Sequence, residues 1–287
     1  MLPILFKIGP IPIHSYGLMI AIGFLTALFF IQRESKRAGI DPEVIGNAAF
    51  WSLLIGIAGT RLLHIIMFPQ YYSWTDPIGW IAIWRGGLVF QGGPPAVLIF
   101  LYFYLKKHGI QFTKVADISA PFLALGHGIG RVGCFLNGCC YGKETSGILG
   151  VSFRRFPFSA ATPPTGSPPF LDQYQRGELA PHALWSHPVY PTQLFSTAGL
   201  ILICVLLLLI RRKWHPFDGF MLPIYFVFYG VFRFIVEFYR GDHNPTHFGT
   251  LSDQQILCIV FVVFGFALFF AMKHYLAKPA AEKARSA

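Results

Sequence analysis

The polar side chains of this sequence that could carry out chemistry are concentrated in one glycine-rich stretch. It runs from Gly126 to Gly142 and reads GHGIGRVGCFLNGCCYG. Glycine allows a backbone to come close to a ligand or to another segment of chain. The stretch therefore predicts a functional site that contains His127, Arg131 and Asn137.

Three arginines lie inside apolar runs, at Arg61, Arg131 and Arg233. An arginine in the hydrocarbon region of a membrane costs at least ~2.5–3.5 kcal/mol, so it usually faces a partner or a cavity. Three of them at one depth would repel one another unless an anion lay between them. Because the guanidinium fork binds phosphate oxygens in pairs, they predict a phosphate-containing ligand. The alternative is that each arginine extends to the lipid headgroups.

A second polar face consists of Tyr229, Arg233, Glu237 and Arg240, whose spacing places them on one side of a helix. Arg233 and Glu237 could form an ordinary salt bridge between adjacent turns. The same pair could instead hold a phosphate on Arg233, with Glu237 orienting the guanidinium. Either arrangement leaves positive charge in excess, because one glutamate faces three arginines.

Three cysteines, Cys134, Cys139 and Cys140, belong to the glycine-rich stretch. A zinc site would need a fourth ligand, and His127 is the one candidate nearby. Disulfide exchange is a second alternative, although adjacent cysteines rarely pair with each other. We expect small buried thiols and no metal, and we expect His127 to be a packed, hydrogen-bonded histidine rather than a base.

The composition indicates a membrane protein. Apolar residue types make up 54% of the 287 residues and charged types 13%, and the mean hydropathy is +0.53, which is far more apolar than an average soluble domain. The net charge of +10 comes from Lys and Arg scattered at the ends of apolar runs. No long basic stripe is present, so nucleic acid is not an expected partner.

The uncharged windows predict an all-α integral membrane protein with about seven transmembrane helices, because a spanning helix needs roughly 20 mostly apolar residues. The windows are Ser15–Gln32, Val44–Thr60, Gly86–Leu105, Ile118–Gly130, Pro191–Ile210, Gly219–Phe232 and Gln254–Met272. Most Lys and Arg at the span ends face the cytoplasm if the N-terminus is outside and the C-terminus is cytoplasmic. In that orientation the three arginines come near the outer ends of their spans, as do Tyr16, Gln91 and Gln193.

The chain is therefore expected to have four parts. Residues 1–140 form spans one to four, residues 141–190 a small irregular periplasmic head, residues 191–275 spans five to seven, and residues 276–287 a disordered cytoplasmic tail. The head is rich in Pro, Gly, Ser and Thr and is longer than an ordinary connection. We expect it to cover the site.

The stretch from Gly130 to Gly142 resembles the signature of the prolipoprotein diacylglyceryl transferases, inner-membrane enzymes that begin bacterial lipoprotein maturation. Other stretches resemble this family in the same order, namely His14–Met19, Gly59–Arg61, Gly86–Gly93, Tyr190–Leu194 and Tyr229–Arg240. The resemblance touches nearly every predicted span, and the head is the part that it covers least.

The resemblance implies a transfer of the diacylglyceryl group of phosphatidylglycerol to the lipobox cysteine thiol of a preprolipoprotein, with formation of a thioether and release of glycerol phosphate. It implies a multi-pass protein of the bacterial inner membrane whose partners are phosphatidylglycerol, the lipobox segment and membrane lipids, with no cofactor. The family's functional positions correspond here to Tyr16, Arg131, Asn137, Gly142, Tyr229, Arg233 and Glu237.

Three positions depart from the family pattern. The first Asn of the signature is Cys134, its Glu is Cys139, and the histidine of span three that is proposed as a base is Gln91. Glutamine cannot take up a proton, so we expect Gln91 to bind the lipid headgroup or a neighbouring side chain through its amide. Arg61 and Arg240 are further candidates for substrate binding.

The expected reaction needs a thiolate, because a free cysteine has a pKa near ~8.5 and its anion is the nucleophile. Arginines near the thiol would lower that pKa and would stabilise the charge on the departing phosphate. We therefore expect Arg131 and Arg233 to clamp the phosphate. Glu237 and His127 are weaker candidates for the base.

Two other functions stay open. Broken helices and intramembrane arginines also occur in transporters of anionic solutes, but no internal repeat is visible and the polar residues gather near one leaflet. A thiol oxidoreductase that uses Cys139 or Cys140 is the other alternative, and serine substitutions would test it.

Overall fold

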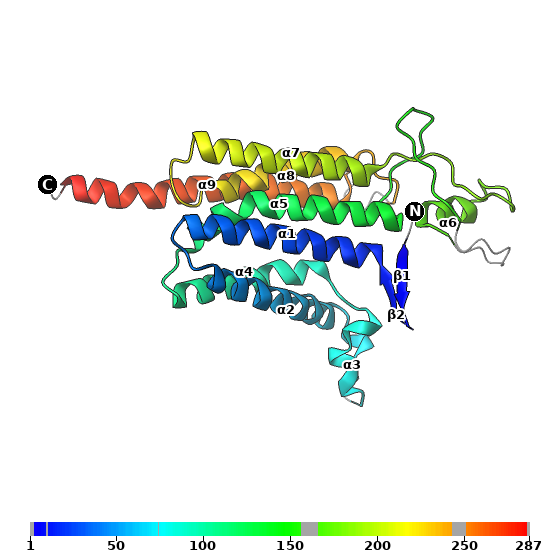
Figure 1. The fold of residues 1–287 in the computed structure, drawn as a ribbon, viewed down its shortest axis with the longest axis horizontal. Coiled ribbons are helices and arrows are strands. Elements are labelled where there is room, and N and C mark those ends of the chain that lie inside the picture. The colour runs from blue at the N-terminus through cyan, green and yellow to red at the C-terminus, as the bar shows by residue number, and fades with distance from the viewer. Residues whose placement is uncertain (1–2, 10, 74, 156–165, 243–250, 286–287) are drawn as a thin grey trace. The chain divides into compact units, whose positions relative to one another are not determined.

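The computed structural model describes residues 3–9, 11–73, 75–155, 166–242 and 251–285, and it is mostly helical (Figure 1). Within these residues, four helices are long and apolar enough to cross a membrane. They are α1 (Ser15–Arg37), α2 (Pro42–Met67), α7 (Thr192–Lys213) and α9 (Asp253–Arg285). Each of them contains most or all of one predicted window, so the structure agrees with a mostly helical membrane protein.

The other three predicted windows also fall on helices, but these are shorter or more polar. α4 (Gly93–Lys107) has 15 residues and α8 (Met221–Glu237) has 17, which at ~1.5 Å per residue is less than the ~30 Å of a hydrocarbon core. α5 (Phe112–Asn137) has 26 residues, and it includes charged residues and several glycines. The number of seven spans therefore stays a prediction.

One compact unit of the chain contains residues 1–27 and 119–287. In Figure 1, α7, α8 and α9 run side by side. The core of the unit is an apolar cluster between α5, α7 and α8, with Phe269 of α9 packed against it. Its buried members are Ala120, Ala124, Leu200, Ile203, Cys204, Leu207, Phe220 and Met221. This packing fixes which faces of α5 and α8 turn toward each other.

The second unit contains residues 28–118. Here α2 packs on α4, and a Cβ on Gly59 would lie only 2.6 Å from the carbonyl oxygen of Gly92. Small residues let helix backbones come this close. The connection from α2 to α4 folds into short elements, which are η1 (Pro69–Tyr71), α3 (Pro77–Ile81), η2 (Ile83–Arg85) and η3 (Phe90–Gly92).

The strands of the described residues form one hairpin near the N-terminus, which is not among the elements expected from the sequence. β1 (Ile4–Ile8) pairs antiparallel with β2 (Ile11–His14), with Ile8 opposite Ile11 and Ile4 opposite His14. Two short runs rich in isoleucine on either side of a turn are typical of a hairpin. The hairpin leads directly into α1.

The predicted head contains α6 (Pro168–Gln175) and isolated β-bridges, and its residues 156–165 lie outside the described residues. At the other end of the chain, α9 continues to Arg285, where a disordered tail is expected from the sequence. Ala, Glu, Lys and Arg dominate this last segment, and all four have high helix propensity. That propensity explains the additional helical turns.

Candidate functional site

Arg131 and His127 lie one turn apart on α5 and are hydrogen bonded. The Arg131 Nε–H donates to His127 Nε2 over 3.2 Å, so Nε2 is an acceptor and the imidazole is neutral, with its proton on Nδ1. Because the lone pair of Nε2 is engaged, His127 is not placed to take a proton from a substrate. The contact instead fixes the direction of the Arg131 guanidinium.

Arg233 and Glu237 form a buried ion pair on α8. Arg233 Nη1 lies 2.6 Å from Glu237 Oε2, and their side chains are 10% and 2% exposed. The Ser252 hydroxyl donates to the other carboxylate oxygen, Oε1, over 3.1 Å. Removing one partner of such a pair leaves a costly isolated charge. Glu237 therefore serves first to keep Arg233 charged and oriented.

The two helices that carry these arginines meet at His127 and Tyr229. The rings of these two residues lie 5.6 Å apart between centroids, and the charges of both Arg131 and Arg233 act on each of them. Glu237 neutralises Arg233, whereas Arg131 is bonded to a neutral imidazole. The neighbourhood thus keeps positive charge that suits an anion such as a phosphate.

The signature stretch leaves α5 through a tight turn. Gly138 has a φ of +80°, a conformation that glycine adopts without strain. The amide of Cys139 donates to the carbonyl of Cys134, and the amide of Gly138 to that of Phe135, which is the hydrogen-bond pattern of a Schellman cap. The cap turns Cys139 and Cys140 back toward the end of α5.

Two buried side chains at the start of α7 hold this turn. Gln193 Nε2 donates to the carbonyl of Cys139 over 2.8 Å, and Thr192 Oγ1 donates to that of Cys140 over 2.7 Å. Both Gln193 and Thr192 are 1% exposed. The sequence predicts only that Gln193 lies near the outer end of its span. Its contact with the signature joins segments more than 50 residues apart, so it depends on how α7 packs.

The three thiols of the signature meet near Tyr16. The Sγ atoms of Cys134, Cys139 and Cys140 all lie within 4.8 Å of one another, and all three cysteines are free. All three also interact electrostatically with Tyr16, the second residue of α1, and so does Arg131. Tyr16 and Arg131 thus belong to the same site as the thiols.

Asn137 and Arg240, two predicted binding residues, act on the same turn. Asn137 is the last residue of α5 and interacts with Cys139 through its side chain. Arg240 is 6% exposed and forms two hydrogen bonds with the carboxylate of Asp242, of 2.6 and 2.7 Å. Its charge also acts on Cys140. The predicted binding residues around the signature are therefore brought together in one unit.

Gly142 lies where three backbone segments cross. Its amide donates to the carbonyl of Tyr190 over 2.9 Å, and the Lys143 amide donates to that of Tyr239 over 2.8 Å. A Cβ on Gly142 would lie 2.6 Å from the first of these oxygens and 2.7 Å from the second. A side chain has no room there, so the close packing of backbone explains why this position is glycine.

The sequence suggests that the glycines of this stretch surround a ligand. In the structure, Gly126 and Gly133 instead pack helices together. A Cβ on Gly126 would lie 2.8 Å from the carbonyl oxygen of Gly23 in α1, and one on Gly133 would lie 2.9 Å from the Cβ of Met19. Small residues at helix contacts bring the backbones close. The case for a functional site here therefore depends on its polar residues and thiols.

Arg61 and Gln91 belong to the other unit, where Arg61 holds a loop. Its guanidinium donates four hydrogen bonds of 2.5–3.1 Å to backbone carbonyls, those of Trp80, Gly86, Gly87 and Gly79. These bonds engage most of the five N–H groups of an arginine, so Arg61 supports the backbone of its own unit. The phosphate-binding role expected from the sequence stays a prediction. Gln91 lies in η3 and is exposed.

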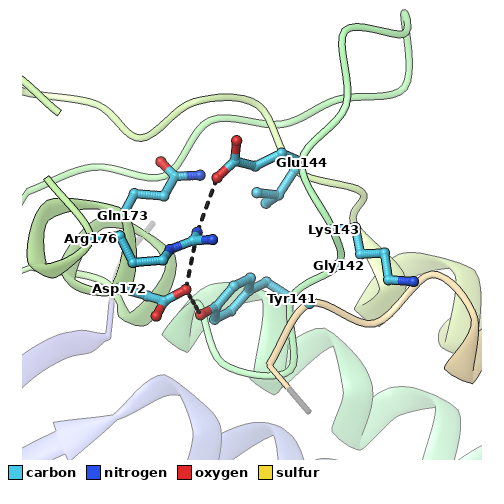
Figure 2. Close-up of a pocket in the computed structure, with 9 residues that line it drawn as sticks. Tyr141, Gly142, Lys143, Glu144, Asp172, Gln173 and Arg176 are labelled. Atoms are coloured by element: carbon cyan, nitrogen blue, oxygen red, sulfur yellow. Dashed lines mark hydrogen bonds and ion pairs between the residues drawn. The ribbon is translucent and has the colours of Figure 1, made fainter. Parts of the chain in front are cut away.

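The head contains a pocket of about 270 Å³ between α6 and the segment that follows the signature (Figure 2). Arg176 forms ion pairs with Glu144 and Asp172, at 3.0 and 3.3 Å. The Tyr141 hydroxyl donates to Asp172 over 3.0 Å. Burial and this carboxylate raise the pKa of Tyr141, so the phenol stays protonated as a donor. The sequence has no motif for this pocket, because its walls come from separate segments of the head.

Comparison with known proteins places these residues in a family. Residues 3–271 match the family model of prolipoprotein diacylglyceryl transferase. A phosphatidylglycerol–prolipoprotein diacylglyceryl transferase of Clostridium tetani is 33% identical over 94% of this chain and 97% of its own length. A relative of the same name from Xylella fastidiosa is 31% identical over 93% of this chain and 91% of its own length. Another, from Francisella tularensis subsp. novicida, is 31% identical over 94% of this chain and 92% of its own length. This chain therefore belongs to the prolipoprotein diacylglyceryl transferase family.

Proposed function

We propose that this chain is a membrane transferase that moves the diacylglyceryl group of phosphatidylglycerol to a cysteine thiol of a prolipoprotein. The names of the relatives, which match nearly the whole chain, support this reaction and both substrates. The structural observation that carries the proposal is the meeting of Arg131 and Arg233 around His127 and Tyr229. A transporter of anionic solutes is not favoured, because the family match covers residues 3–271.

The phosphodiester of the lipid binds between the guanidinium groups of Arg131 and Arg233. His127 holds the first guanidinium and Glu237 the second, so both are oriented before the lipid arrives. Donors that are fixed in advance need no reorganisation when charge develops on the leaving group, which is why such groups contribute strongly to catalysis. Tyr16 and Tyr229 belong to the same neighbourhood.

The lipobox thiol attacks, as a thiolate, the glycerol carbon that carries the phosphate. A carbon–sulfur bond forms, giving the thioether, and the carbon–oxygen bond to the phosphate breaks. The electron pair of that bond leaves with glycerol phosphate. Positive charge from Arg131 and Arg233 stabilises both the thiolate and the departing phosphate.

None of the three candidate side chains is placed to accept the proton of the substrate thiol. Gln91 has no basic atom, Nε2 of His127 accepts a hydrogen bond from Arg131, and Glu237 is bonded by Arg233 and Ser252. Deprotonation must therefore depend on positive charge near the thiol or on a group outside this set.

The proposed topology is a multi-pass protein of the bacterial inner membrane with seven spans, the N-terminus outside and the C-terminus cytoplasmic. Residues 1–140 and 191–275 supply the spans, residues 141–190 the periplasmic head and residues 276–287 the cytoplasmic end. The distribution of Lys and Arg at the span ends supports this orientation. It places the arginine site in the outer leaflet, where a secreted substrate can reach it.

The test is a reaction of the purified protein with phosphatidylglycerol vesicles and a lipobox peptide. Mass spectrometry should detect a peptide that has gained a diacylglyceryl group through a thioether. A peptide with serine in place of the lipobox cysteine, and vesicles of phosphatidylethanolamine, should yield no product. Absence of the product from the folded wild-type protein would refute the proposed function.

A further inference from the structure

We propose that Cys134, Cys139 and Cys140 bind one Zn²⁺ ion whose fourth coordination position takes the thiol of the substrate cysteine. The inference rests on the proposed transferase function, and it identifies the group that deprotonates the thiol. It departs from the expectation, based on sequence alone, that these thiols are small buried residues with no metal.

The sulfur positions are close to those of a zinc site. Zn–S bonds of ~2.3 Å in a tetrahedron place the sulfurs ~3.8 Å from one another. In the structure all three Sγ atoms lie within 4.8 Å of one another, so each pair has to close by at most about one ångström. Rotation of the side chains can supply a movement of this size.

The backbone around the thiols is built to present them. The cap at the end of α5 returns Cys139 and Cys140 toward Cys134, and buried side chains of α7 hold the carbonyls of the first two. Cys140 has a φ of +62°, a conformation that a non-glycine residue seldom adopts. Glycine would suit that backbone better, so a role for the Cys140 thiol explains why a cysteine is present.

The number of ligands indicates a catalytic site and not a structural one. Structural zinc sites have four protein ligands, whereas catalytic sites have three and keep an open position. Among the described residues, no fourth His, Cys, Asp or Glu belongs to this group. Cys134 is 7% exposed, while Cys139 and Cys140 are only half-buried, so the group has an accessible side. Cysteine thiolates are ligands that bind zinc well, as they bind soft metals.

Zinc supplies the chemistry that the side chains do not. A thiol that coordinates a metal cation is deprotonated outright, so the substrate thiol would bind as a thiolate and release its proton to water. Its sulfur then attacks the glycerol carbon, and the carbon–oxygen electron pair leaves with glycerol phosphate. The thioether product carries no charge and leaves the metal. Arg131, whose charge acts on Cys140, would hold the phosphate beside this thiolate.

Metal binding is tested with the full-length protein in detergent, reduced and stripped with a chelator. Zn²⁺ added to wild-type protein should bind at one ion per chain, and Co²⁺ should give a thiolate-to-metal charge-transfer band. Cys134→Ser, Cys139→Ser and Cys140→Ser should each weaken binding at least ~10-fold. Cys204→Ser and Cys258→Ser, buried cysteines of α7 and α9, should leave stoichiometry and spectrum unchanged.

The open position is tested with the lipobox peptide. The peptide should change the Co²⁺ spectrum, and the same peptide with serine in place of its cysteine should not. Transfer should be lost after chelation and restored by Zn²⁺. Equal metal content in the three serine variants would overturn the proposal, and so would full activity of metal-free protein or of protein with a Cys134–Cys139 disulfide. Zinc binding with the spectral change but no lipid transfer would instead refute the proposed function and leave the site intact.

Discussion

The Nε–H of Arg131 donates a hydrogen bond to Nε2 of His127, one helical turn earlier on α5, over 3.2 Å. Protonation of this imidazole would replace the acceptor with a second positive charge, so the contact exists only with neutral histidine. His127, which the sequence offers only as a weaker candidate for the base, therefore orients a cation in the structure. The same division of roles applies on α8, where Glu237 orients Arg233.

Arg131→Ala and Arg233→Ala are each expected to abolish transfer while the protein still inserts into membranes. Each change removes a charge-assisted phosphate contact worth about 1.5–3 kcal/mol or more in a dry site. Lysine at either position should rescue poorly, because it lacks the planar fork. Product formation in vesicles measures the effect, and wild-type rates in either alanine variant would rule out the clamp.

Arg61→Met is expected to destabilise the protein more than Arg131→Met does. Arg61 donates hydrogen bonds to four backbone carbonyls, and their loss should cost about 3 kcal/mol or more. The hydrogen bond that Arg131 donates to the neutral imidazole of His127 is worth about 1 kcal/mol. Thermal unfolding in detergent and amide hydrogen exchange of residues 79–87 provide the measurement. Equal protection of that loop in both variants would contradict the assignment.

Gly142→Ala is expected to disrupt the crossing of backbone segments beside the signature. Its Cβ would lie 2.6 Å from the carbonyl oxygen of Tyr190, so one of the two segments must move. Gly17→Ala is the matched control, because nothing lies within 4 Å of the corresponding Cβ. Limited proteolysis of the head should reveal the difference between the two variants. Identical digestion patterns would show that the backbone crossing can accommodate a side chain at position 142.

Gln91 is expected to have no part in deprotonating the substrate thiol. The pH–rate profiles of wild type, Gln91→His and Gln91→Ala should therefore share the same acid limb, with at most a modest loss of rate in the alanine variant. A different result would be a rise of about 100-fold in Gln91→His with a new limb near pH ~6.5, the usual value of an imidazole. That outcome would mean that the wild type lacks a base that it needs.

Alkaline-phosphatase fusions should test the orientation of the chain. A fusion at Tyr174, in α6 of the head, should be active, and a fusion at Lys213, the last residue of α7, should be silent. Alkaline phosphatase folds only outside the cytoplasm, so its activity reports the side of the membrane on which the fusion point lies. The opposite pattern would place the arginine site in the inner leaflet, away from secreted substrates.

The amino-acid sequence by itself determined the membrane character, the family and the residues that share a helical face. Hydropathy depends on composition over about 20 residues, and a spacing of four residues places side chains on one face of a helix whatever surrounds it. The contacts of His127 with Arg131 and of Glu237 with Arg233 are of this local kind.

Only the tertiary structure decided which helix faces meet and what each polar group contacts. It brought α5 and α8 together at His127 and Tyr229, and it gave Arg61 the carbonyls of a loop as partners. It also gathered three thiols that the sequence presents as small buried residues. Spacing along the chain sets a direction for each side chain, whereas distances between segments follow from packing, cap geometry and buried hydrogen bonds such as that of Gln193.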